Sequence, residues 1–144
     1  MSERHPLGLR EITLLNLGGR RVRLHAWTGH GSEAPHDHRA PFIGIPLLGR
    51  FTETRYVRRI GWDHRLVDTW QPDGQERVYR DHGESSGLDV DAVYIRRPLK
   101  PYRCPVDAVH TYTPRGRGPH LSLVLLGRPV RDASTVWLKT EENP

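Results

Sequence analysis

Two histidines stand two positions apart, His36 and His38, and a third, His110, follows a turn much later in the chain. In an extended segment, residues i and i+2 point to the same face, so the first two imidazoles can bind one ion together. His110 stands near the start of a short predicted strand, which would bring its imidazole to the same ion. Three histidines from neighbouring strands leave half of an octahedron open, an arrangement that binds substrate and O2 at non-haem iron. The spacing therefore predicts a mononuclear metal centre.

Other side chains are candidates for roles around this ion. Tyr112 follows His110 by two residues, so we expect its phenol beside the metal as a catalytic acid, hydrogen-bond donor or radical-stabilising group. The alternative is a barrel tyrosine whose hydroxyl is hydrogen-bonded. Guanidinium geometry suits a carboxylate, so Arg23, Arg50 and Arg55 are candidate substrate-binding residues. An outward-facing charged stripe is the simpler explanation of these arginines.

Two acidic residues and a further histidine are also candidates. His30 and Glu33 precede the H-x-H pair in a predicted loop and could supply an outer hydrogen bond or an alternative ligand, unless they are only solvated. Glu53, on a later predicted strand, could supply a carboxylate ligand or could point to solvent. Four other histidines have no partner spacing and are predicted at surface or strand positions: His25, His64, His82 and His120.

The elements that must position these residues are short strands, because 14 Gly and 12 Pro interrupt the chain every few positions. Strict alternation over 20–27 predicts a half-buried strand with Val22, Leu24 and Ala26 on one face. Further strands are predicted at 42–48, 51–57, 62–70, 76–80, 90–96, 109–113, 121–126 and 131–138. We expect a hairpin of 42–48 with 51–57, a pairing of 62–70 with 76–80 across a turn at 71–74, and polar loops at 28–34 and 81–87.

About eight strands with tight turns predict an all-β protein, built as a small antiparallel barrel. We expect one domain over 1–144, with its core at about 20–138 and short flexible termini. Large aromatic side chains are expected to fill the core and the pocket wall, because a small barrel needs them. These residues are Trp27, Phe42, Trp62, Trp70 and Trp137.

The histidine motifs resemble those of the cupin superfamily, which carries a first motif G-x5-H-x-H-x3,4-E-x6-G and a second motif with one histidine after a turn. The matching residues are Gly31-x4-His36-Asp-His38 with Gly49 for the first motif, and Tyr102-x2-Pro105-x4-His110 for the second. The resemblance covers about residues 20–138. It implies a cupin double-stranded β-helix, with the three histidines as metal ligands and with homodimerisation through sheet edges.

One position departs from the cupin pattern. Phe42 or Ile43 stands where the first motif has its glutamate, so the usual fourth protein ligand is missing. A triad of histidines alone is similar to that of the thiol dioxygenases, exemplified by cysteine dioxygenase, which bind Fe(II). The resemblance therefore implies Fe(II) as the metal and leaves the reaction open.

The charge of such a centre suggests its substrates. Three neutral ligands leave the ion its full positive charge, which favours an anionic or thiol-bearing small molecule in the open positions. We expect an Fe(II) dioxygenase or related oxidative enzyme acting on a small thiol, amine or carboxylate, with molecular oxygen as co-substrate. The alternatives are a Zn(II) or Ni(II) cupin catalysing an isomerase, lyase or bond-rearranging step, and a metal-dependent small-molecule-binding module.

The formal net charge of +5 admits an anionic partner, but the arginines are dispersed and no nucleic-acid-binding motif is present, which argues against nucleic acid. The single cysteine, Cys104, cannot form an internal disulfide. The first residues lack the apolar segment of a secretory signal, and no apolar run approaches the ~20 residues that cross a bilayer. We therefore expect a cytoplasmic protein without membrane association.

Overall fold

A computed structural model describes residues 2–4, 9–27, 33–72 and 75–140 of the chain. These ranges contain ten strands and no helix, which confirms the predicted all-β class. The strands are β1 (Ser2–Arg4), β2 (Leu9–Leu17), β3 (Arg20–Trp27), β4 (Phe42–Leu48), β5 (Arg50–Trp70), β6 (Val78–Arg96), β7 (Tyr102–Cys104), β8 (Val109–Arg115), β9 (His120–Leu126) and β10 (Ser134–Lys139). Most of the predicted loop 28–34 and half of the predicted turn 71–74 lie outside the described residues. Within them, we find no helical segment with the length and apolar character needed to cross a membrane.

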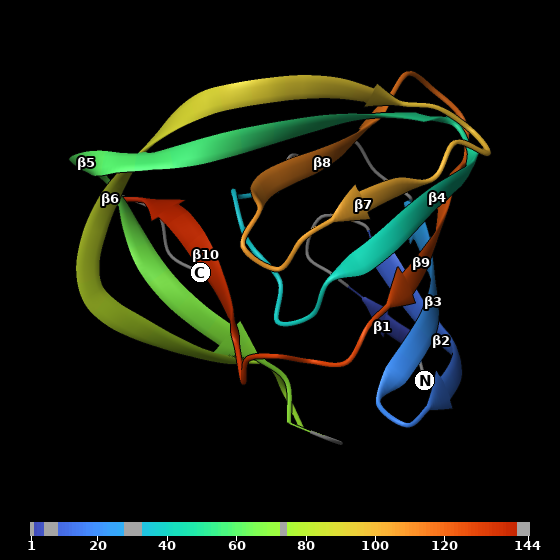
Figure 1. Ribbon diagram of the computed structural model, residues 1–144, viewed down its shortest axis with the longest axis horizontal. Helices are drawn as coiled ribbons and strands as arrows, with labels where there is room; N and C mark the ends of the chain where they lie inside the picture. Colours follow the sequence, from blue (N-terminus) through green and yellow to red (C-terminus); the bar gives the residue numbers. More distant parts are fainter. Residues whose placement is uncertain (1, 5–8, 28–32, 73–74, 141–144) are drawn as a thin grey trace.

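The strands form two antiparallel sheets (Figure 1). Sheet A has the strand order β1-β2-β3-β9-β4-β7. In sheet B, β5 pairs with β6 over most of its length, with β8 through its first part and with β10 through its last part. Trp27 of sheet A lies 5.9 Å from Phe51 and 6.0 Å from Tyr112 of sheet B, measured between ring centroids. The two sheets therefore enclose one aromatic core, as in the predicted small barrel.

β2 is a strand that the sequence did not predict. It pairs with β3 from Leu9, opposite Trp27, to Leu17, opposite Arg20, with one bulge near residue 14. Sheet A thus begins well before residue 20, where the predicted core starts. The pairing matters for the site because it places the side chains of β2 beside those of β3.

The inward face of β3 is the one that carries charge. Arg23 pairs directly with Val124 of β9, which is 5% exposed. His25 pairs in the same way with Ser122, which is 1% exposed. Directly opposed residues of antiparallel strands share a face, so Arg23 and His25 point into the barrel. The alternation predicted the strand correctly, but its apolar face is turned outward, because the interior here holds polar groups.

The predicted hairpin of 42–48 with 51–57 is wrong. β4 pairs with β7 and β9 in sheet A, whereas β5 pairs within sheet B. Gly49 lies between them at φ 79°, a left-handed conformation that glycine adopts without strain. A Cβ atom there would also collide with the ring of His120. The chain changes sheet at Gly49 instead of folding back on itself.

β5 and β6 are much longer than predicted. The predicted strands 51–57 and 62–70 are both parts of β5, and 76–80, 90–96 and the predicted loop 81–87 lie mostly or wholly within β6. The predicted pairing of 62–70 with 76–80 is confirmed. The register shifts between Arg59 and His64, and both strands curve strongly on the left of Figure 1. The polar segment 81–87 forms a strand because it pairs with β5, and most of its side chains point to solvent.

The core has two parts. The larger joins both sheets and contains Leu9, Trp27, Phe42, Phe51, Tyr102, Cys104, Tyr112 and Val124. The smaller contains Leu66, Val109 and Trp137 between β5, β8 and β10. Trp70 is half-buried. The prediction that Trp62 fills the core is wrong, because it lies where the β5–β6 register shifts and is 80% exposed.

Candidate metal centre

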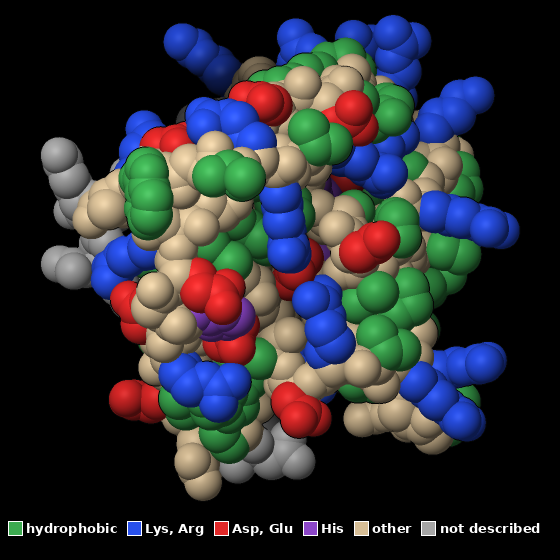
Figure 2. Space-filling view, turned by 60° about the vertical axis from the view of Figure 1, so that its left-hand side comes forward, with side chains coloured by type: hydrophobic (Ala, Val, Ile, Leu, Met, Phe, Trp, Pro, Cys, Tyr) green, Lys and Arg blue, Asp and Glu red, His purple; other side chains and the backbone are tan. Residues whose placement is uncertain are grey.

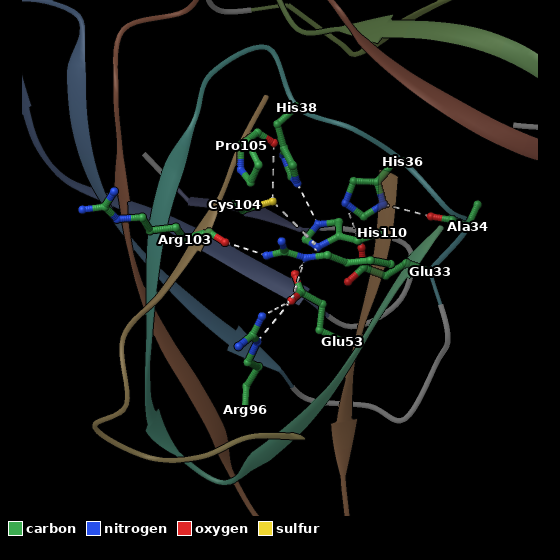
Figure 3. A network of polar contacts seen from close by, with 11 residues as sticks. Glu33, Ala34, His36, His38, Glu53, Arg96, Arg103, Cys104, Pro105 and His110 are labelled. Carbon is green, nitrogen blue, oxygen red and sulfur yellow. Dashed lines mark hydrogen bonds and ion pairs between the residues drawn. The ribbon is translucent and has the colours of Figure 1, made fainter. Parts of the chain in front are cut away.

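The rings of His36, His38 and His110 converge, as Figure 3 shows. Each offers one ring nitrogen, and the three atoms lie within 4.8 Å of one another. The Nε2 atoms of His38 and His110 are 2.9 Å apart. His110 is buried, whereas the side chain of His36 is 18% exposed and can be reached from solvent. The structure thus brings the three predicted ligands together from β8 and from the segment before β4.

Hydrogen bonds at Nδ1 determine that His36 and His110 turn their Nε2 atoms toward the centre. His36 Nδ1 donates to the carbonyl oxygen of Ala34 at 2.9 Å, and His110 Nδ1 lies 2.6 Å from Oε2 of Glu53. A histidine held in this way presents the lone pair of Nε2 to a metal. Two such nitrogens in adjacent octahedral positions, at metal–nitrogen distances of about 2.1 Å, would be about 3.0 Å apart. The 2.9 Å separation of the two Nε2 atoms fits this arrangement.

The imidazole of His38 is also in the protonation state that a metal ion needs. Burial lowers the pKa of His38 well below its ordinary value, and the neighbouring rings of His36 and His110 lower it further. His38 is therefore neutral at physiological pH. A neutral imidazole is the form that binds a metal ion.

Backbone pairing and Asp37 position the H-x-H segment. His36 N donates to His110 O at 3.0 Å and His110 N donates to His36 O at 2.9 Å, which fixes the segment against β8. Asp37 is fully buried and accepts hydrogen bonds from Thr135 N at 2.7 Å and from Arg131 Nη1 at 3.0 Å. Asp37, the middle residue of the motif, therefore holds the segment to β10 and to Arg131 just before it, while His36 and His38 supply the imidazoles.

Glu53 lies behind His110 and is completely buried. Its carboxylate also accepts hydrogen bonds from Arg96 Nε at 3.1 Å and Arg55 Nε at 3.3 Å. Burial raises the pKa of Glu53, but the hydrogen bonds from His110 and Arg96 outweigh burial and lower it, so the carboxylate is ionised. Glu53 contacts Nδ1 of His110, whereas Nε2 faces His38. It orients a ligand and does not fill the place of the missing cupin glutamate.

Glu33 lies beside His36. One of its carboxyl oxygens is 3.4 Å from His36 Nε2, although Glu33 does not join the group of three converging ligand atoms. Burial, followed by the charge of Glu11, raises the pKa of Glu33 to about 8. Most of this carboxyl group is therefore protonated at neutral pH and can donate a hydrogen bond. Its companion candidate, His30, lies outside the described residues.

The three candidate arginines are in different surroundings. Arg23 points into the barrel, and its Nη1 is 3.1 Å from Oε2 of Glu11. Arg55 is held by Glu53 and by a backbone carbonyl of β7. Arg50 is exposed at the start of β5. The outward-facing stripe therefore describes Arg50 but not Arg23, and a role in substrate binding stays a prediction for all three.

Tyr112 is buried on β8, two residues beyond His110. Its ring stacks on Phe51 at 4.5 Å and lies 5.7 Å from Tyr102, measured between centroids. Burial raises the pKa of Tyr112 above its ordinary value, so the phenol is neutral. Tyr112 is therefore part of the aromatic core, and its catalytic role stays a prediction.

Cys104 forms a second potential ligand group with Glu53 and His110. This group surrounds His110 Nδ1, which is 3.9 Å from the sulfur and already bonded to Glu53. Burial raises the pKa of Cys104 to about 12, so the thiol is protonated. Since metals bind the thiolate, the second group does not suit an ion at neutral pH.

Sequence analysis missed a polar wall on the inward face of sheet A, formed by Glu11, Arg23 and His25. Glu11 of β2 pairs in register with His25, and the His25 Nε2 atom lies 3.6 Å from Oε1 of Glu11. His25 also lowers the pKa of His38, which places the wall near the centre. The available signal was the charged face of 20–27, but alternation does not tell which face is inside.

A cleft of about 360 Å³ adjoins Glu33. Its walls include Pro35, Tyr56, Trp137 and Lys139. Glu33 therefore contributes to the cleft and also contacts His36. The cleft volume lies within the range of small-molecule sites, about 300 to 1,000 Å³.

Comparison with solved structures identifies the fold. Peruvianin-I, a cysteine peptidase from Thevetia peruviana latex, superposes with a TM-score of 0.54 at 14% identity, covering 90% of this chain and 66% of its own. An RmlC-like cupin from Shewanella frigidimarina gives 0.53 at 12% identity, covering 89% and 85%. Oxalate oxidase in complex with the substrate analogue glycolate gives 0.50 at 16% identity, covering 90% and 55%. This chain therefore spans about half to two thirds of the peruvianin-I and oxalate oxidase chains. No protein-family model and no curated protein sequence matches it.

These similarities and the converging histidines define a cupin fold with a three-histidine group that could hold a metal ion. The predicted cupin resemblance and the predicted barrel are confirmed. At such low sequence identity, the comparisons establish the fold and leave the reaction to be argued from the site.

Proposed function

We propose that this chain is a mononuclear metal-dependent cupin enzyme, and that it is a non-haem Fe(II) dioxygenase or a related oxidative enzyme acting on a small thiol, amine or carboxylate. The observation that carries the proposal is the convergence of three imidazoles, two with their Nδ1 atoms held by hydrogen bonds. The fit of the 2.9 Å nitrogen separation to an octahedral ion supports it. Iron in such a site would supply the redox chemistry that activates O2.

Residues of the chain would orient the ligands of the ion and bind the substrate. Glu53 holds the Nδ1 proton of His110 and keeps its Nε2 directed at the ion. Glu33, protonated beside His36, would donate a hydrogen bond to a substrate heteroatom bound there. Arg23, on the facing wall, would attract the negative end of the substrate, after exchanging its contact with Glu11.

The test is metal analysis followed by activity. We expect the purified protein to bind one divalent ion per chain and to consume O2 when loaded anaerobically with Fe(II) and given small thiols, amines and carboxylates. His38→Ala should lose the metal. His82→Ala, which replaces a histidine outside the centre on β6, should keep it.

Two results would contradict different parts of the proposal. If the protein carries stoichiometric zinc and the iron-loaded form consumes no O2 with any of these substrates, the oxidative reaction is rejected in favour of a non-oxidative Zn(II) or Ni(II) cupin. If no divalent ion binds more tightly to the natural chain than to His38→Ala, the metal centre itself is rejected.

A further inference from the structure

Backbone pairs join β5, β8, the H-x-H segment and β10 into a closed ring, which we call the strand ring. The first part of β5 pairs with β8, and its last part pairs with β10. Between β8 and β10 runs the H-x-H segment, where His36 pairs with His110 on one side and with Val136 on the other. β10 thus lies inside the curve of β5 and β6 (Figure 1). The strand ring has an interior of its own, because β5 bends back to meet both partners.

The interior of the strand ring and the candidate metal centre lie on opposite faces of the strands that they share. Directly opposed residues of antiparallel strands share a face, so His36 and His110 point the same way, toward the centre. Successive side chains alternate, so Pro35 and Thr111 point the other way, into the ring. Tyr56 of β5 is paired with the residue two positions before Thr111, so it also points into the ring.

The cleft of about 360 Å³ lies within this interior. Its walls include ring-facing side chains of the H-x-H segment, β5, β8 and β10, namely Pro35, Tyr56, Thr111 and Trp137. Leu88 of β6 lines it as well, and Tyr56 and Leu88 both pack against the buried cluster that contains Trp137. The cleft therefore has an apolar side that is fixed by packing.

Polar side chains stand at the rim of the cleft. Lys139 of β10 and His64 of β5 are directly opposed in the strand pairing, and both line the cleft. Lys139 is exposed and makes no ion pair within the described part of the chain. Glu33, the acidic residue of the lining, lies 3.4 Å from His36 Nε2 instead, as Figure 3 shows. The ammonium group of Lys139 can therefore receive an anionic group.

The indole of Trp137 adds a hydrogen-bond donor that the described residues leave unpaired. Trp137 is 0% exposed, and its Nε1 atom has no acceptor among the described residues. The guanidinium of Arg58 lies 4.6 Å from the centroid of the ring and holds the indole in place. Because buried polar groups almost always have a partner, an unpaired donor on a residue that lines a cleft favours a bound acceptor.

The lining indicates the class of ligand. The rings of Trp137 and Tyr56, with Pro35 and Leu88, suit a flat aromatic body, since aromatic rings pack well on one another and on apolar side chains. The ammonium of Lys139 suits a carboxylate, which forms charge-assisted hydrogen bonds. Small-molecule sites combine mostly apolar walls with a few polar groups in this way. We propose that the interior of the strand ring is a second binding site, which takes a small aromatic carboxylate.

This proposal does not rest on the proposed function. None of the three imidazoles of the candidate metal centre lines the cleft, so the ligand would bind without a metal ion. The H-x-H segment is a wall between the two sites, with Pro35 on the side of the ring and the ring of His36 on the side of the centre.

The test is isothermal titration calorimetry of the full chain with three probes: benzoate, benzyl alcohol and acetate. The buffer contains EDTA, so that no probe binds through a metal ion. We expect benzoate to bind with a Kd of about 1 mM or tighter, which is within the limits for a ligand of its size. Benzyl alcohol lacks the charge and acetate lacks the ring, so each should bind at least about 10-fold more weakly.

Substitutions assign the binding to the cleft. Lys139→Gln should weaken benzoate binding about 10-fold, because it removes the ammonium partner of the carboxylate. Lys100→Gln is the matched control, because Lys100 is the other lysine of the chain, is exposed between β6 and β7, and should leave the affinity unchanged. Tyr56→Ala should also weaken binding by removing an aromatic wall, and if it does not fold, Lys139→Gln on an exposed side chain decides. His38→Ala should bind benzoate as the natural chain does.

Three outcomes would overturn the proposal. The first is a natural chain that binds benzoate no more tightly than acetate. The second is an equal benzoate affinity in the natural chain and Lys139→Gln, which would place the ligand outside the cleft. The third is loss of benzoate binding in His38→Ala with native circular dichroism, which would place the ligand at the three histidines. Metal titration judges the candidate metal centre separately, so either proposal can fail without the other.

Discussion

At the scale of single residues, the centre depends on the proton that each imidazole keeps. His110 Nδ1 is held by an ionised, buried carboxylate, and His36 Nδ1 by a backbone carbonyl. Both arrangements leave Nε2 as the free lone pair, which is how proteins fix the orientation of histidine ligands. Glu53 is itself held by Arg96 and Arg55, so its position is determined by three partners rather than one.

Replacing the carboxylate tests this orientation. We expect Glu53→Gln to weaken divalent-metal binding by about 10-fold to 100-fold, because the neutral amide stabilises the His110 ring less and can turn its NH2 group toward Nδ1. Competition titration with a chromophoric chelator measures the affinity. Glu84→Gln, on an exposed side chain of β6, is the control and should bind metal as the natural chain does. Equal metal affinities in the natural chain, Glu53→Gln and Glu84→Gln would mean that the Glu53 carboxylate does not orient His110.

At the scale of elements, the H-x-H segment works as a short bridge between strands. His36 pairs through its backbone with His110 of β8 and with Val136 of β10. Asp37 adds the charged hydrogen bonds that hold the segment to Thr135 and Arg131. Further backbone hydrogen bonds, such as Asp37 N to Thr135 O at 3.0 Å and Trp137 N to Pro35 O at 2.8 Å, hold the same segment. The Asp37 carboxylate adds to them, and it needs its side-chain partners because a buried polar group without partners is costly.

Asp37→Asn therefore should lower the free energy of unfolding by about 2 kcal/mol, since it replaces one of two buried acceptor oxygens by an NH2 group that would face the donor Thr135 N or Arg131 Nη1. Urea denaturation followed by fluorescence measures the loss. Metal affinity should fall too, because the same segment carries both histidines. Asp89→Asn, which removes an exposed partner of Arg59, should change stability little. A variant as stable as the natural protein would show that backbone pairing alone positions the segment.

The curved ends of β5, β6 and β10 are joined through Asp68. Its carboxylate is 2.6 Å from His82 Nε2 and 3.1 Å from Arg80 Nη2, and it accepts a hydrogen bond from Thr135 Oγ1 at 3.0 Å. Burial raises the pKa of Asp68, but the hydrogen bonds from His82, Arg80 and Thr135 outweigh burial and lower it. The folded state therefore binds this proton less readily than the unfolded state.

A lowered pKa stabilises the fold above the unfolded value of about 3.9, and this contribution is lost as the pH falls through the folded value. We expect the natural protein to lose stability more steeply than Asp68→Asn as the pH falls from about 5 to about 2. Urea denaturation at a series of pH values measures both curves. Asp91→Asn, on an exposed part of β6, should follow the natural protein. Parallel curves for the natural protein and Asp68→Asn would contradict the expectation.

At the scale of the whole molecule, positive charge is abundant but dispersed. Figure 2 shows Lys and Arg side chains over the whole visible face, with acidic side chains among them. Several arginines of the chain are paired, such as Arg59 with Asp63 and Asp89, and Arg65 with Asp81. A dispersed and partly paired charge makes few simultaneous phosphate contacts.

Nucleic acid should therefore bind weakly. We expect fluorescence anisotropy with a labelled DNA duplex to give a Kd weaker than about 1 μM at physiological salt, with any binding lost as salt is raised. Binding that is tighter than this at physiological salt, and that weakens steeply as salt is raised further, would restore nucleic acid as a partner. A basic DNA-binding domain measured in parallel is the control.

Local patterns in the sequence were sufficient for several features. The H-x-H spacing and the position of His110 predicted three converging imidazoles, alternation predicted β3, and residue composition between Gly and Pro turns predicted most of the other strands. Gly49 matched the cupin motif, and the structure supplies the reason, since a positive φ and the ring of His120 both exclude a side chain there. The H-x-H spacing and the strand patterns depend on residues a few positions apart, whose geometry the backbone dictates.

Tertiary structure decided the rest. A period of two defines two faces of β3 but not which one turns inward, and pairing with β9 turned the charged face toward the centre and the aliphatic face toward solvent. In the same way, only the pairing of β5 with β8 brings Glu53 close to His110, and only the packing of the segment before β4 sets Glu33 beside His36. Such contacts join residues far apart in the chain, and no local pattern encodes which distant strands will be neighbours.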